Sequence, residues 1–168
     1  MVNSQVEKPK LFRAQIRDLA VKALISASVL PKENIFPNIP AAIPQEMLPA
    51  IFVSVPYDHG ESKAASGPDF LRTSALVLQI FCEYLKFSRG MDEIETLCND
   101  TEHAIFCNCE LQHEVEQFSS VKTQITLHTD STIRVAEARI IMEFQYSQTF
   151  NPDGPDMNEI DLQLKATN

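Results

Sequence analysis

The sequence predicts an α+β fold: a mixed, mainly antiparallel four-stranded sheet flanked by two helices, with a proline-rich linker and an extended C-terminal arm. One observation is the run Arg134–Tyr146, where apolar residues alternate with mostly polar ones. This period of two is typical of a strand with one buried face. A second observation is the helical spacing of apolar residues in Pro9–Ser28 and Asp92–Phe106. A third is the presence of three further strand-length apolar runs.

The first helix is predicted from Pro9 to Ser28. Proline suits the first turn of a helix, because its missing N–H would have no partner there. Arg13 and Arg17 share one face of this helix, with Lys10 nearby. Such a basic face is most often solvated, but this one could also pair with an acidic patch on a neighbouring subunit.

The segment Pro31–Pro49 contains five prolines, which exclude a regular helix or a central strand. It nevertheless carries many apolar side chains, including Ile35, Phe36 and Ile39. Burying the apolar side chains of such a linker against another surface lowers its free energy. We therefore expect this segment either to lie on its own domain or to bind a neighbour.

The first strand is predicted over Ala50–Tyr57. The residues that follow, Asp58–Asp69, are small and polar, which indicates a mobile loop. A long strand then covers Leu71–Lys86, and its middle, Ala75–Cys82, is apolar on both sides except for Gln79. This pattern indicates a central strand that is covered on both faces.

Gly90 is expected to end that strand. Asp92 and Glu95 have the spacing of a capping box, so the second helix is predicted over Asp92–Phe106. The alternating run Val121–His128 is then predicted to be a strand that reaches the final strand through a tight turn.

A length of 168 residues fits one domain, which we place at 1–150 with a flexible stretch at 1–8, followed by a C-terminal arm at 151–168. The apolar residues of this arm are enough to add an edge strand to another sheet: Ile160, Leu162 and Leu164.

The composition argues against several functions. A formal charge of −9 and a pI of about 4.8 disfavour gripping DNA or an anionic membrane, because both are negative. No run approaches the roughly 18 apolar residues of a membrane span, and the first residues lack the layout of a signal peptide. We therefore expect the four cysteines to be reduced, as in a cytosol.

Four potential zinc ligands cluster in one short stretch: His103, Cys107, Cys109 and His113. A Cys-x-Cys pair is not the usual ligand spacing, however, and the group crosses the predicted end of a helix. We therefore predict no metal and no cofactor. The segment Gly60–Gly67 lacks the Gly-Lys-Ser/Thr ending of a phosphate-binding loop, and no nucleophile elbow accompanies the four histidines. The chain is not expected to be an enzyme.

The order of the elements resembles that of the tail terminator proteins of long-tailed bacteriophages, the lambda-type minor tail protein family. The residues that carry this resemblance are the strands Leu48–Val55 and Leu76–Tyr84, the helix Asp92–Phe106 and the final strand Ala136–Tyr146, within a span of roughly Leu11–Phe150. The resemblance implies an α+β domain that forms a hexameric ring on the end of the tail tube. Such a ring stops tube polymerisation and presents a surface for head attachment. The family offers no catalytic residues to carry over.

The resemblance also implies partners: further copies of this chain, the tail tube protein, head–tail connector proteins and, in a contractile tail, a sheath protein. It implies a location at the head-proximal end of the tail of a virion that is assembled in the host cytoplasm. DNA would pass through the ring without specific binding, and no membrane would be involved. A related head–tail connector or tail completion protein is an alternative, as is a small ligand- or peptide-binding module.

Two groups of residues are candidate contact sites. The apolar residues of the linker and the arm are candidates for a subunit interface: Ile35, Phe36, Ile39, Phe150, Ile160 and Leu162. The small polar loop is the candidate for facing the lumen or the tube: Asp58, His59, Glu61, Lys63 and Asp69.

Overall fold

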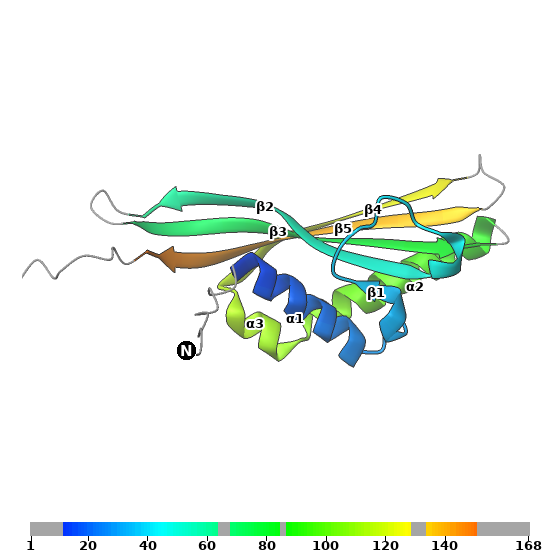
Figure 1. Ribbon diagram of the computed structural model, residues 1–168, viewed down its shortest axis with the longest axis horizontal. Coiled ribbons are helices and arrows are strands. Elements are labelled where there is room, and N and C mark those ends of the chain that lie inside the picture. The colour runs from blue at the N-terminus through cyan, green and yellow to red at the C-terminus, as the bar shows by residue number, and fades with distance from the viewer. Residues whose placement is uncertain (1–11, 64–67, 85–86, 129–133, 151–168) are drawn as a thin grey trace, which may run out of the picture.

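The computed structural model describes residues 12–63, 68–84, 87–128 and 134–150. These residues form one sheet with α-helices on one side (Figure 1). The elements in chain order are α1 (Phe12–Ser26), η1 (Lys32–Asn34), β1 (Ile35–Phe36), η2 (Gln45–Met47), β2 (Ala50–Ser62), β3 (Asp69–Glu83), α2 (Phe87–Phe106), α3 (Cys109–Glu114), β4 (Gln117–His128) and β5 (Val135–Thr149), where η marks a short 3₁₀ helix.

The sheet confirms the predicted α+β class and its mainly antiparallel pairing. Its strand order is β1-β2-β3-β5-β4. Only β1 runs parallel to its neighbour, and the other pairs are antiparallel. The described residues form five strands, where the sequence predicts four, because two residues of the proline-rich segment, Ile35 and Phe36, pair with Ile51 and Phe52. The pair is short and lies at an edge of the sheet, where nearby prolines are tolerated.

The core lies between one face of the sheet and the helices (Figure 1). The alternation predicted for β5 is confirmed, because its inward residues from Ala136 to Phe144 are fully buried and Tyr146 is only 6% exposed. On the neighbouring strand β3, Leu76 and Leu78 stand beside Met142 and Ile140. The apolar stripe of α1 covers this face with four buried residues: Ile16, Ala20, Ala23 and Leu24.

The central position predicted for β3 is also confirmed. The strand lies between β2 and β5, and every residue from Ser74 to Leu78 is buried. On the face opposite the helices, Phe52 of β2 is fully buried between Phe36 and Phe81, with ring centroids 5.2 and 5.9 Å away. An aromatic cluster therefore closes this face near β1.

The predicted loop Asp58–Asp69 is wrong for Asp58–Ser62 and for Asp69, which lie in strands, and its residues 64–67 lie outside the described residues. Strand β2 continues to Ser62, and β3 begins at Asp69, so the two strands form a long hairpin. A register irregularity between Ser54 and Tyr57 separates its buried part from its polar part. The polar part has few apolar residues to reveal a period of two, because it extends beyond the helices, as Figure 1 shows at its left-hand end.

Helix α2 begins earlier than predicted, at Phe87, and Gly90 lies inside it. Asp92 is therefore not a capping residue, since it lies five residues after the start of the helix. The glycine is required by Tyr84, because a Cβ at position 90 would stand 2.6 Å from the Tyr84 Cγ. Gly90 thus allows the end of β3 and the start of α2 to approach closely.

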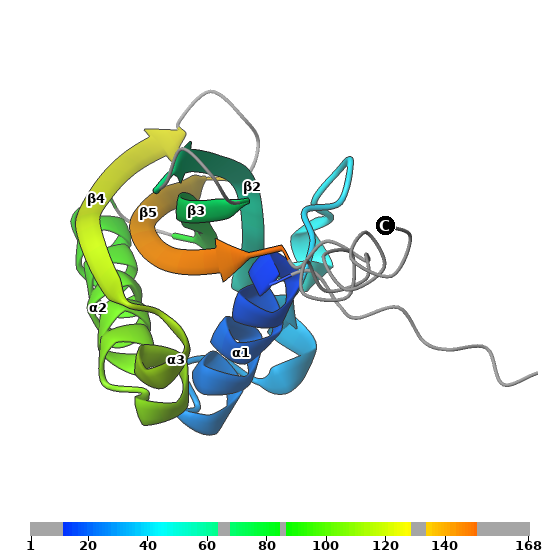
Figure 2. The same ribbon diagram turned by 90° about the vertical axis from the view of Figure 1, so that its left-hand side faces the viewer.

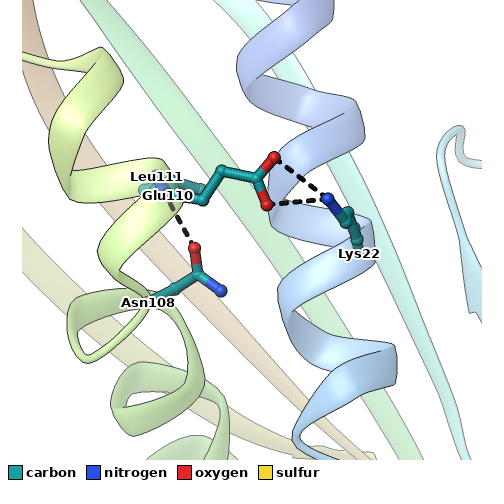
Figure 3. A network of polar contacts seen from close by, with 4 residues as sticks. All are labelled: Lys22, Asn108, Glu110 and Leu111. Atoms are coloured by element: carbon teal, nitrogen blue, oxygen red, sulfur yellow. Dashed lines mark hydrogen bonds and ion pairs between the residues drawn. The ribbon is translucent and has the colours of Figure 1, made fainter.

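A short third helix, α3, was not predicted from the sequence. Asn108 caps its N-terminus, and the Asn108 Oδ1 accepts a hydrogen bond from the backbone N–H of Leu111 at 2.9 Å. The Lys22 Nζ of α1 donates to both carboxylate oxygens of Glu110 at 3.0 and 2.7 Å (Figure 3). Together with the buried Leu111 these contacts hold α3 against α1.

Candidate interaction surfaces

The polar half of the β2–β3 hairpin and the end of β5 form a sheet extension, defined here as residues 57–62, 69–74 and 146–149. It projects past α1 and α3 at one end of the molecule (Figure 1). Within it, β3 pairs on one side with β2 and on the other with β5. The described helices cover little of it, so this extension presents much of its surface to solvent or to a neighbour.

A polar cluster organised by Asp58 lies at the base of the sheet extension. The Asp58 carboxylate accepts hydrogen bonds from Ser74 Oγ at 2.7 Å and from Tyr146 Oη at 3.2 Å, and it forms an ion pair with Arg72. The side chains of Asp58 and Arg72 are only 12% and 23% exposed. Asp58 thus lies on a strand, where a loop was predicted, and its carboxylate is engaged inside its own subunit; its place at the lumen stays a prediction.

Aromatic side chains surround this cluster. The Arg72 guanidinium lies 5.9 and 6.0 Å from the ring centroids of Phe70 and Phe150, within the range of cation–π attraction. The ring of Phe12, at the start of α1, lies 4.2 Å from that of Tyr146. Burial and the nearby Asp58 charge raise the pKa of the Tyr146 hydroxyl. The cluster thus ties the sheet extension to the first turn of α1.

The other predicted lumen residues are mostly strand residues. His59 and Glu61 lie on β2, 3.8 Å apart at their closest polar atoms, and both are exposed. Asp69 is the first residue of β3. Lys63 alone lies in the connection between the strands, and its Nζ donates to the Ser147 hydroxyl. These side chains therefore belong to a stiff hairpin.

The predicted interface residues separate into two groups. Ile35 is 5% exposed and packs in the core of its own subunit, so little of its side chain is available to an interface. Phe36 is half-buried and stacks on Phe52. Ile39 and Phe150 are each 45% exposed. Two further candidates lie outside the described residues: Ile160 and Leu162.

The exposed Ile39 belongs to an arm, defined here as residues 37–49, that projects beside β2 (Figure 2). The base of the arm is closed by Asn34, whose Nδ2 donates to the carbonyl oxygens of Met47 and Pro49 at 3.2 and 2.7 Å. Gln45 Nε2 donates to the Glu83 carboxylate at 3.1 Å. These hydrogen bonds therefore attach the base of the arm to the rest of the domain, and the exposed Ile39 lies beyond that base.

Both edges of the sheet remain open over long stretches of the described chain. Strand β4 pairs with β5 on one side only, and most of its residues are exposed. Strand β2 pairs with β1 only at Ile51 and Phe52, so no described strand lies beside its residues Val53–Glu61. The two edges differ in sequence and lie on opposite sides of the sheet. An open edge is a template for pairing with another chain.

A cavity of about 590 Å³ lies where β3 ends and α2 begins. In Figure 1 these two elements meet at the end of the molecule away from the sheet extension. The cavity is bounded by the segment after α1, the base of the arm, the end of β3 and the first half of α2. Its lining residues are Leu30, Leu48, Pro49, Cys82, Glu83, Asp92, Glu93, Thr96 and Leu97. This volume is in the range of sites that bind small molecules or peptide side chains.

The four potential zinc ligands lie along the end of α2 and α3, and all four are exposed: His103, Cys107, Cys109 and His113. Within the described ranges, no three His, Cys, Asp or Glu side chains are placed to hold a metal ion. The other two cysteines are buried. Burial, followed by the charge of Glu93 for Cys82 and of Glu102 for Cys98, raises the pKa of each thiol to about 11. Such thiols are poor nucleophiles at neutral pH.

Sequence reasoning missed the Asp58 cluster, although one signal was available. Asp58 and Arg72 are opposite charges on either side of a short polar segment, which is the arrangement of a hairpin with a cross-strand ion pair.

No helix in the described part of the chain is long and apolar enough to cross a membrane.

Comparison with known proteins gives a likeness to distant solved structures. No protein-family model matches the sequence, and no curated protein matches it. Among solved structures, the chain is similar to one chain of a structure titled "Virion of native gene transfer agent (GTA) particle". That match covers 80% of this chain and 94% of the other, with 8% sequence identity and a TM-score of 0.47.

Proposed function

We propose that this chain is a structural virion protein that forms a ring on the end of a bacteriophage tail tube, ends tube polymerisation and provides the surface for head attachment. The observation that carries the proposal is the pair of different open sheet edges on one subunit, β4 on one side and Val53–Glu61 of β2 on the other. A closed ring requires two different surfaces that meet head to tail around a rotation axis. The element order that resembles tail terminators supports the same role.

The sheet extension and the arm fit this role, because both project from the domain and are poorly covered within one subunit. In the proposed ring, the arm with its exposed Ile39 contacts a neighbouring subunit or the tail tube. The role is architectural and involves no turnover. A formal charge of −9 would let DNA pass through the ring without specific binding, since the two repel each other.

The proposal is tested by electron microscopy of the purified protein and of a variant with a blocked edge. Val121 is 48% exposed on the open edge strand β4, and Val121→Lys places a charge where a neighbouring strand would pair. We expect sixfold rings for the wild type, and their loss in the variant. The matched control is Gln112→Lys on the exposed surface of α3, which should leave the rings intact. Rings that persist in Val121→Lys would contradict the edge contact.

A second candidate function is a small ligand- or peptide-binding module, which the cavity of about 590 Å³ beside the arm favours. This function predicts a monomer or dimer whose thermal stability rises when a ligand occupies the cavity. The two functions predict different molar masses for the protein in solution. A stable monomer that also fails to bind tail tubes would favour the binding module.

A further inference from the structure

The cavity of about 590 Å³ has an apolar floor and an acidic rim. Leu30, Leu48 and Leu97 supply aliphatic side chains, and the charged lining residues are all acidic. Those acids are Glu83, Asp92 and Glu93, and no lysine or arginine stands among the described residues that line the cavity. A site of this composition favours an apolar segment that carries a positive charge.

The carboxylates of Asp92 and Glu93 are exposed on α2, and within the described ranges neither has a hydrogen-bond or ion-pair partner. Glu83 is partly engaged, because it accepts a hydrogen bond from Gln45. Burial and the charge of Glu93 raise the pKa of the Cys82 thiol, which lines the same cavity. The negative field of the rim therefore extends to the cavity wall.

The segment that precedes α1 has the complementary chemistry. Residues 6–11 read Val-Glu-Lys-Pro-Lys-Leu, with two lysines beside aliphatic residues. This segment joins α1 at Phe12, whose ring packs on Tyr146 at the base of the sheet extension. The cavity is instead lined by Leu30, which follows the other end of α1. The start of α1, which this segment precedes in the sequence, and the acidic cavity therefore lie towards opposite ends of the molecule.

The length of α1 separates the start of this helix from the cavity of the same copy. Fifteen helical residues, from Phe12 to Ser26, span about 21 Å at 1.5 Å per residue. Lys8 and Lys10 precede Phe12 by only four and two residues in the sequence. A second copy whose α1 begins beside the cavity brings these lysines to the acidic rim without that distance to cross.

We propose that the cavity receives the Val6–Leu11 segment of a neighbouring copy of this chain, with Lys8 and Lys10 at the acidic rim and the aliphatic side chains on the apolar floor. This inference rests on the proposed ring, because it names one head-to-tail contact between its subunits. The contact joins two different surfaces, one at each end of α1, as a closed ring requires.

The test uses the full-length chain as a mixture of unlabelled and ¹⁵N-labelled protein, coupled with a water-soluble carbodiimide. This reagent joins a lysine amine to a carboxylate that it touches. We expect hybrid products, one peptide from each isotopic copy, that link Lys8 or Lys10 to Glu83, Asp92 or Glu93. Products confined to a single copy, or hybrid products that map to other carboxylates, would overturn the inference.

A second measurement uses the double variant Asp92→Asn with Glu93→Gln and compares self-association by light scattering at low salt. We expect association to weaken roughly three- to tenfold, the equivalent of two partly exposed ion pairs. The matched control is Asp100→Asn with Glu114→Gln, two exposed acids outside this cavity. The control removes the same charge from a chain of net charge −9, so it should leave association unchanged or slightly stronger.

Equal weakening by both double variants would overturn the inference, because the effect would then depend on total charge. The outcome is separable from that of the ring proposal. Rings whose hybrid products map away from the cavity would leave the ring in place and remove this contact. A chain that never self-associates gives no hybrid product, which overturns the contact. The ring proposal is then tested separately, by whether the chain binds as six copies to the end of a tail tube.

Discussion

The substitution Asp58→Asn should loosen the sheet extension. The carboxylate accepts hydrogen bonds from Ser74 and Tyr146 through Oδ1 and pairs with Arg72 through Oδ2. An asparagine of the same shape has one carbonyl oxygen and one NH₂ group, and it carries no charge. Either the NH₂ group faces the guanidinium, which is also a donor, or it donates to the two hydroxyl groups, which must then accept. In both arrangements the half-buried Arg72 loses its counter-charge.

The expected loss of stability follows from how deeply the Asp58–Arg72 ion pair is buried. Removing one partner of a fully buried ion pair costs about 3–5 kcal/mol, whereas an exposed pair contributes about 0–1 kcal/mol. The side chains of Asp58 and Arg72 are 12% and 23% exposed, so this pair lies between the two limits. We expect Asp58→Asn to lower the free energy of unfolding by about 2 kcal/mol.

The assay is urea unfolding followed by circular dichroism, with Glu61→Gln as the matched control. Glu61 is on the same strand, and its side chain is 79% exposed, so the control should change the unfolding free energy by less than about 0.5 kcal/mol. Hydrogen exchange should locate the loss of protection in the sheet extension. If the two variants are equally stable, the Asp58 cluster does not hold the extension and the reasoning fails.

Two further predictions concern packing. Gly90→Ala should destabilise the fold by about 1–3 kcal/mol although alanine favours helices, because its Cβ would stand 2.6 Å from Tyr84. The control is Gly60→Ala, whose Cβ meets its nearest atom at 3.4 Å and which should change stability little. A Gly90→Ala variant that is more stable than the wild type would refute the clash. Because of the thiols of Cys82 and Cys98, the free energy of unfolding should fall between pH 9 and 11 by up to about 2 kcal/mol per thiol, since the unfolded chain releases protons that the folded chain keeps. Urea unfolding across this pH range measures the fall. A double Cys→Ala variant with the same pH dependence would contradict the prediction.

The parts of the fold that sequence reasoning found are those where burial imposes a period. Strand β5 alternates because one face is covered by helices, and its inward residues are buried as predicted. Strand β3 reads as apolar on both sides because it is central. The strand predicted at Val121–His128 begins earlier, at Gln117, because its first residues lie at an exposed edge where polarity shows no period.

The parts that it missed depend on tertiary contacts. The polar half of the β2–β3 hairpin is held by pairing and by the Asp58–Arg72 ion pair, neither of which leaves an apolar pattern. Gly90 was interpreted as a strand end, whereas its role is to admit the Tyr84 side chain against α2. The burial of Ile35 required knowing that its segment joins the sheet as β1. The candidate interface residues of the proline-rich segment were predicted from their apolar character alone, which does not distinguish the buried Ile35 from the exposed Ile39.

The central claim is that copies of this chain close into a ring. It is tested most directly by the molar mass of the full-length protein, measured by light scattering over a concentration series with and without tail tubes. The account predicts a mass that rises towards about 113 kDa, six times the 18.9 kDa of one chain, or six copies bound at each tube end. A mass of 18.9 kDa at every concentration, with no binding to tubes, would contradict it.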